Sequence, residues 1–145
     1  MSLGFNVQEK RGKVSYSQKY ANAIVYGKAT KSEGDEFNVE QGKALAFARC
    51  DAMIRKTELA NARRVRDVLM RAMAHEQLEF GEGPSAAKIY MRHVQQACEY
   101  VRILEKYYRN QKRIVKELEV HTFPGLTCKE ILQKVHDIVC KNTVA

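Results

Sequence analysis

The sequence has few of the features that mark a membrane, secreted or disordered protein. It contains two prolines and no run approaching the roughly 18 apolar residues of a membrane-spanning helix, which predicts an ordered, soluble chain. Residues 1–5 lack the charged start and apolar run of a secretion signal, so we expect a cytoplasmic protein. With 145 residues, of which 45% are hydrophobic, residues 1–145 are expected to fold as a single domain.

Cysteine is scarce, and its spacing does not indicate a metal or disulfide framework. The four cysteines lie inside helical patterns, where small buried thiols are expected: Cys50, Cys98, Cys128 and Cys140. His136 and Cys140 can face one ion from a single helix, but two ligands do not make a zinc site. Cys128 lies about 18 Å along the same helix from Cys140, too far to share that ion. We therefore predict neither metal nor cofactor.

The sequence also lacks a recognisable catalytic motif. His93 and Cys98 point about 140° apart on one helix and cannot pair within it. The glycine-rich segment 81–88 follows a helix and lacks the Gly-Lys-Ser/Thr order of a phosphate loop. A non-enzymatic protein is predicted. A Cys/His enzyme stays as a second alternative, which requires the fold to bring a histidine and a cysteine together in a cleft.

Helical periodicity is the strongest pattern that the sequence does contain. Residues 85–120 repeat apolar side chains at steps of three and four, which predicts one long helix with a packing seam. The members of that seam, of which only Gln111 is polar, are Ala87, Tyr90, Val94, Ala97, Val101, Leu104, Tyr108, Gln111, Val115 and Leu118.

The remaining elements follow from caps and turn residues. Residues 12–29 read as two short antiparallel strands, after an irregular start. Asn38 and Gln41 cap a helix over 38–80, which either is continuous or breaks near Thr57, and Thr127 and Glu130 form a capping box before a helix over 127–142. The short link near 81–84 requires the long helices to be antiparallel. The predicted fold is α+β and mostly α: a β-hairpin and turn in 1–34, a long helical hairpin formed by 38–80 and 85–120, and a short C-terminal helix.

Residues 27–49 resemble a strand–loop–helix element of small proteins encoded by bacteriophages and prophages of Gram-positive bacteria. The resemblance is carried by the pattern D-x-F-x4-G-x2-L-A-x2-R, formed by Asp35, Phe37, Gly42, Leu45, Ala46 and Arg49. It implies a phage-type accessory protein in the host cytoplasm, a class with no single shared activity. Locally, Phe37 is expected to fill the strand–helix corner, while Gly42 and Ala46 let the strands lie close to the helix.

The net charge of +8 predicts a polyanionic partner, either nucleic acid or an acidic, nucleic-acid-handling host protein. The candidate binding residues are basic side chains of the two long helices: Arg63, Arg64, Arg66, Arg102, Lys106, Arg109, Arg113 and Lys116. The alternative interpretation is an ordinary solvated face, in which nearby acids pair with these cations at helical spacing: Glu99, Glu105, Glu117 and Glu119.

The length of the seam predicts a homodimer, because a third helix of about 15 residues cannot cover a 35-residue helix. The predicted oligomer seam consists of Val94, Val101, Leu104, Tyr108 and Val115. It supports an alternative function, a structural or assembly protein whose working surface is apolar. The two functions differ in salt response, since an electrostatic complex weakens with salt and an apolar interface does not.

Overall fold

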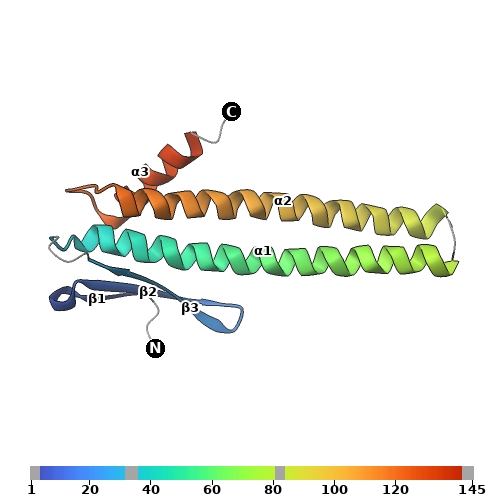
Figure 1. The fold of residues 1–145 in the computed structure, drawn as a ribbon, viewed down its shortest axis with the longest axis horizontal. Helices are drawn as coiled ribbons and strands as arrows, with labels where there is room; N and C mark the ends of the chain where they lie inside the picture. Colours follow the sequence, from blue (N-terminus) through green and yellow to red (C-terminus); the bar gives the residue numbers. More distant parts are fainter. Residues whose placement is uncertain (1–3, 32–35, 81–83, 142–145) are drawn as a thin grey trace. The chain divides into compact units, whose positions relative to one another are not determined.

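The computed structural model describes residues 4–31, 36–80 and 84–141, and they form a mostly helical α+β fold, as predicted (Figure 1). In chain order the elements are β1 (Gly4–Gln8), a 3₁₀ turn η1 (Glu9–Arg11), β2 (Lys13–Tyr20), β3 (Ala23–Thr30), α1 (Val39–Phe80), α2 (Pro84–Val120) and α3 (Cys128–Lys141). The link at 81–83, and with it the start of the glycine-rich segment, lies outside the described residues.

The chain divides into two compact units, and each long helix contributes to both. The sheet unit comprises residues 1–55 and 109–145, and the hairpin unit comprises residues 56–108. Within each unit the segments of α1 and α2 run antiparallel (Figure 1). Of the two predictions for the first helix, the continuous one is confirmed, since α1 passes Thr57 without a break.

The sheet has three antiparallel strands in the order β1-β2-β3, one more than predicted. The prediction of an irregular start over residues 1–11 was wrong, because β1 pairs with β2 and places Phe5 opposite Tyr16. The two rings pack with centroids 4.8 Å apart. Only two apolar side chains, Phe5 and Val7, alternate in β1, so its period-two signal is too short to recognise without its pairing partner.

The sheet packs on α1 through unusually small residues. Ala46 of α1 is fully buried, and a Cβ atom added to Gly27 of β3 would lie 2.5 Å from the backbone nitrogen of Cys50. The Cys50 thiol donates a hydrogen bond to the carbonyl oxygen of Val25, with Sγ and O 3.4 Å apart. Strand and helix backbones are therefore nearly in contact.

The strand–loop–helix segment has the local packing that its residues predict. Phe37 packs on the buried cluster of Val14, Ala29 and Ala46. A Cβ atom added to Gly42 would lie 2.9 Å from Cγ2 of Val14, so the first turn of α1 also approaches the sheet closely. Asp35, the first residue of the pattern, lies outside the described residues.

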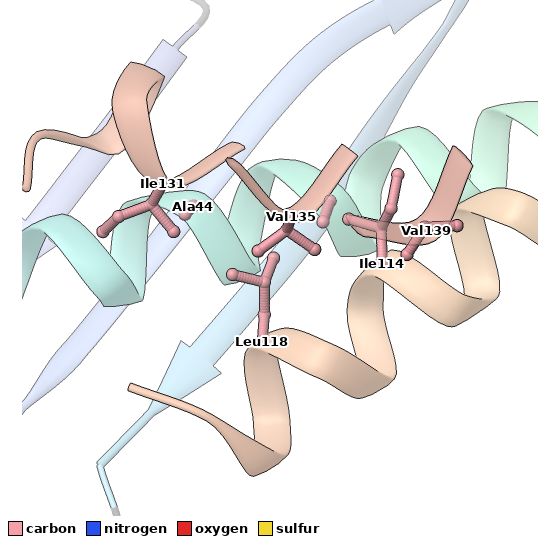
Figure 2. Close-up of a cluster of buried hydrophobic side chains, with 7 residues drawn as sticks. Ala44, Ile114, Leu118, Ile131, Val135 and Val139 are labelled. Atoms are coloured by element: carbon pink, nitrogen blue, oxygen red, sulfur yellow. The ribbon is translucent and has the colours of Figure 1, made fainter. Parts of the chain in front are cut away.

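The opposite side of α1 in the sheet unit is covered by α2 and α3. Figure 2 shows the α3 side chains pointing at both long helices, in a cluster formed by Ala44, Ala48, Ile114, Leu118, Ile131, Val135 and Val139. The predicted capping box starts α3: the Glu130 amide donates to Oγ1 of Thr127 over 3.3 Å, and the Thr127 amide donates to Oε1 of Glu130 over 3.4 Å.

Gln41 is a buried polar residue that ties the start of α1 to the end of α2. Its Nε2 donates to the carbonyl oxygens of Leu118 and His121, each 3.0 Å away, and its Oε1 accepts from the Phe123 amide at 3.3 Å. Its own amide donates to Oδ1 of Asn38 over 3.1 Å, which confirms the predicted cap. One side chain thus satisfies the free carbonyls at a helix end.

Replacing this amide by an apolar group is expected to destabilise the fold. Gln41→Leu removes three hydrogen bonds and leaves buried backbone groups unpaired, so the free energy of unfolding should fall by about 2–4 kcal/mol. Urea titration followed by circular dichroism measures it. The control Gln133→Leu removes an exposed amide that donates to Asp137 and should change stability by less than about 0.5 kcal/mol. Equal stability of the two variants would contradict this account of Gln41.

In the hairpin unit, the predicted seam packs against α1 of the same chain. Val101 and Leu104 are 2% and 5% exposed and contact Leu59 and Ala62, with Tyr108 at the edge of the cluster. In the sheet unit, Val115 packs on the α3 cluster. Val94 is half-buried. The seam that was expected to hold a second copy is therefore largely filled within one chain.

Candidate nucleic-acid interface

One side of α2 carries five cations that we call the α2 cation stripe. Its members step by four, three, four and three residues, so they share one side of the helix: Arg102, Lys106, Arg109, Arg113 and Lys116. All five side chains are exposed. Arg102 and Lys106 belong to the hairpin unit and the other three to the sheet unit. The stripe extends about 21 Å along the helix, with one positive charge about every 5 Å.

Three of the four glutamates that were expected to neutralise these cations contact other residues. Glu105 accepts from Arg63 over 3.3 Å, and Glu119 accepts from Arg49 over 3.2 Å. Glu117 has a carboxylate oxygen 3.5 Å from Nε2 of His121. Among the described side chains, no member of the stripe forms an ion pair. The stripe is therefore a line of uncompensated positive charge.

In the sheet unit, the end of the stripe borders a groove of about 760 Å³ between β3, α1 and α2. Ala52 and Val115 contribute apolar lining, and two large side chains beside them, Tyr26 and Met53, are 51% and 54% exposed. The basic residues that line the groove are Lys28, Arg49, Lys112 and Lys116. An apolar lining next to cations suits a ligand that is both flat and anionic.

The residues that line the groove keep a net positive charge, because the carboxylate among them is already paired. Nη2 of Arg49 contacts Glu119, the acidic residue in the lining, over 3.2 Å. Nη1 of Arg49 donates to the carbonyl oxygen of Lys28 over 2.6 Å, which holds the guanidinium between β3 and α2. The lysines at the rim thus face solvent beside a neutral ion pair.

The predicted arginine cluster of α1 is mostly engaged elsewhere. Arg63 pairs with Glu105, and Nε of Arg66 lies 3.1 Å from Oδ1 of Asp67, while Arg64 is exposed. The contribution of Tyr26 was not predicted, because no sequence pattern places a strand residue beside a helix some 90 positions later. The lysines and the tyrosine meet only through the fold.

The structure does bring one cysteine next to a histidine. Sγ of Cys140 lies 3.5 Å from Nε2 of His136, and Nδ1 of His136 lies 3.8 Å from Oδ1 of Asp137. The imidazole side chain is 59% exposed on α3, and none of the three residues lines the groove. Among the described residues no three potential ligands gather around a metal position. The contact is a surface pair rather than a substrate cleft.

The cysteines differ in burial, and we expect their reactivity to differ accordingly. Burial, reinforced by the negative charge of Asp51, raises the pKa of the Cys50 thiol, and burial together with Glu40 raises the pKa of Cys128. Thiolate is the reactive form, so these two thiols are poor nucleophiles at neutral pH. Iodoacetamide labelling followed by peptide mass spectrometry should modify Cys140 and Cys98 well before Cys50 in the folded protein. Comparable labelling of all four would contradict the packing of β3 on α1.

The raised pKa of Cys50 also predicts the direction of the pH dependence. The unfolded chain releases this proton at a lower pH than the folded chain does, because only the folded thiol is buried. This contribution to stability is therefore fully present at neutral pH and is lost as the pH rises above the ordinary thiol value of 9.0. Urea midpoints measured from neutral to alkaline pH should fall, and Cys50→Ala should reduce the slope.

Comparison with known proteins finds no matching family model, no similar curated protein and no similar solved structure. Within the described part of the chain, no helix is long and apolar enough to cross a membrane. The stripe and the groove are therefore the features of the molecule that bear on its function.

Proposed function

We propose that the protein binds nucleic acid without catalysing a reaction, through the α2 cation stripe and the adjoining groove. The observation that carries the proposal is that the five stripe cations are exposed and form no ion pair with a described side chain, while three neighbouring glutamates contact Arg49, Arg63 and His121. The resemblance of residues 27–49 supports placing this activity in a phage-type accessory protein acting in the host cytoplasm.

The spacing of the stripe suits a phosphate backbone. Cations at intervals of about 5 Å along a helix can each contact phosphates and release condensed counterions. The groove adds a feature that a duplex does not need: an exposed tyrosine ring beside lysines, on which an unstacked base can lie. Single-stranded nucleic acid is therefore the favoured ligand.

Fluorescence anisotropy with labelled single strands and duplexes at two salt concentrations tests the proposal. Five phosphate contacts predict a slope of about −3.5 in a plot of log affinity against log salt for a single strand. Affinity should thus fall about 100-fold between about 50 and 200 mM salt. Absence of binding at the lower salt, with the protein folded, would overturn the proposal and leave an acidic host protein as the partner to seek.

The tyrosine of the groove provides a separate prediction. Tyr26→Ala removes the exposed ring without touching a cation, so single-strand affinity should fall about 10-fold, while duplex affinity should stay unchanged. The control Ile24→Ala truncates an exposed side chain two residues earlier in β3, which does not line the groove. Equal losses for single strand and duplex would show that Tyr26 does not stack on bases.

A further inference from the structure

The hairpin unit has a second, mostly apolar line on each helix, beside the filled seam; its polar members are Asn61, His93 and Gln96. On α2, six residues each stand immediately before a seam residue and step by four, three, four, three and four: Ile89, His93, Gln96, Tyr100, Ile103 and Tyr107. On α1, four residues each stand immediately before Ala62, Arg66, Leu69 or Met73: Asn61, Val65, Val68 and Ala72.

Both lines lie on the same side of the hairpin unit. A shift of one residue turns a side chain by about 100° around the helix, and the same shift on two antiparallel helices points to the same side of the pair. Residues one position after the seam must then lie on the opposite side. The ion pair between Arg63 and Glu105 confirms this geometry, since Arg63 follows Ala62 and Glu105 follows Leu104. The ten residues of the two lines are called the apolar face.

The apolar face is exposed in the single chain. Val65, Val68, Ile89, Tyr100 and Ile103 are 57%, 56%, 59%, 55% and 45% exposed. So much apolar surface in one patch is unusual for a monomer.

In the sheet unit, the same line of α2 is covered. There it continues as Ile114, which is 5% exposed and packs against α3 (Figure 2). The described part of the hairpin unit contains no third helix. In the sheet unit α3 thus covers this line, whereas no described helix covers it in the hairpin unit.

We propose that a second copy of this chain covers the apolar face, so that two hairpin units form a four-helix bundle. The face is about 27 Å long on α2 and about 17 Å long on α1, and at about 10 Å per helix it covers about 440 Å² per copy. The total of about 900 Å² is that of a small, reversible interface. None of its ten members is Asp, Glu, Lys or Arg, and the charged residue that continues the α1 line, Glu58 before Leu59, stands at its end. Pairing the two faces therefore brings no like charges together in the middle of the interface.

The proposal does not depend on nucleic-acid binding, and the two surfaces are compatible. Arg102, the stripe cation that follows Val101 in the hairpin unit, stands on the side opposite the apolar face. Dimerisation through that face leaves this cation accessible.

Sedimentation velocity of the full chain over a range of concentrations tests the pairing. The parent protein should sediment as a dimer of twice 16.6 kDa, with little dependence on salt. Val68→Glu with Ile103→Glu places charges in the middle of the apolar face and should give a monomer with unchanged circular dichroism. The matched control is Met70→Glu with Met91→Glu, at residues 45% and 49% exposed that follow Leu69 and Tyr90 on the opposite side, and it should stay dimeric.

A monomeric parent at every concentration, or a variant of the apolar face that stays dimeric, would overturn the proposal. If the glutamate variant loses its helical signal, the milder Ile103→Ser should still raise the dimer dissociation constant about 10-fold, and an unchanged constant would be equally decisive. Oligonucleotide binding measured on the monomeric variant reports separately on the cation stripe.

Discussion

Reversing Arg109, Arg113 and Lys116 to glutamate should weaken binding to a single-stranded oligonucleotide by about 100-fold or more at 50 mM salt. These three stripe cations are exposed, and none is paired with a described carboxylate. Losing three phosphate contacts removes the corresponding counterion release, and the new carboxylates add repulsion. Anisotropy titrations should also show a salt slope that is less steep by about 2.

The matched control makes the same charge change at three lysines outside the stripe and the groove. Lys10, Lys19 and Lys129 are exposed lysines on η1, β2 and α3, and their reversal to glutamate also lowers the formal net charge from +8 by six, to +2. This control should lose much less affinity, because it lacks only the long-range attraction. Equal losses in the two triple variants would mean that net charge, rather than the stripe, governs binding.

Gly27→Ala should be among the most destabilising single substitutions in the chain, with a loss of about 3 kcal/mol in the free energy of unfolding or a failure to fold. The added Cβ atom would overlap the carbonyl oxygen of Ala46 and lie 2.5 Å from the backbone nitrogen of Cys50. Both are backbone atoms of α1, so no side-chain rotation relieves the overlap. The sheet would have to move away from the helix, and urea titration measures the cost.

Gly42→Ala is the informative comparison. Its Cβ atom would lie 2.9 Å from Cγ2 of Val14, a buried and stiff β-branched side chain, so this contact also costs stability. Alanine favours a helix over glycine by about 1 kcal/mol, which offsets part of that cost. We expect a clearly smaller loss than for Gly27→Ala. If Gly27→Ala is equally mild, β3 and α1 are not as close as the structure places them.

Local signals predicted most of the secondary structure. The heptad-like seam of α2, the Asn38 cap of α1 and the capping box of α3 depend on residues within a few positions of one another, and all three are present. The first strand was missed because five residues with two apolar side chains carry too little period-two pattern.

The candidate site was predictable only in part. The α2 cations follow from helical spacing, but whether they are neutralised depends on partners 42 and 70 positions away: Arg63 for Glu105 and Arg49 for Glu119. Sequence spacing allowed the same glutamates to pair within α2. The fold decided otherwise, by placing arginines of α1 closer to them.

The sequence by itself determined the helices, their caps, the seam and the excess of positive charge, because each follows from contacts between near neighbours in the chain. Only the tertiary structure decided which cations remain unpaired, that Tyr26 lies beside the lysines of α2, and that the seam is filled internally while the line beside it is exposed. These features depend on how distant segments pack, and close packing at small residues such as Gly27 sets that arrangement.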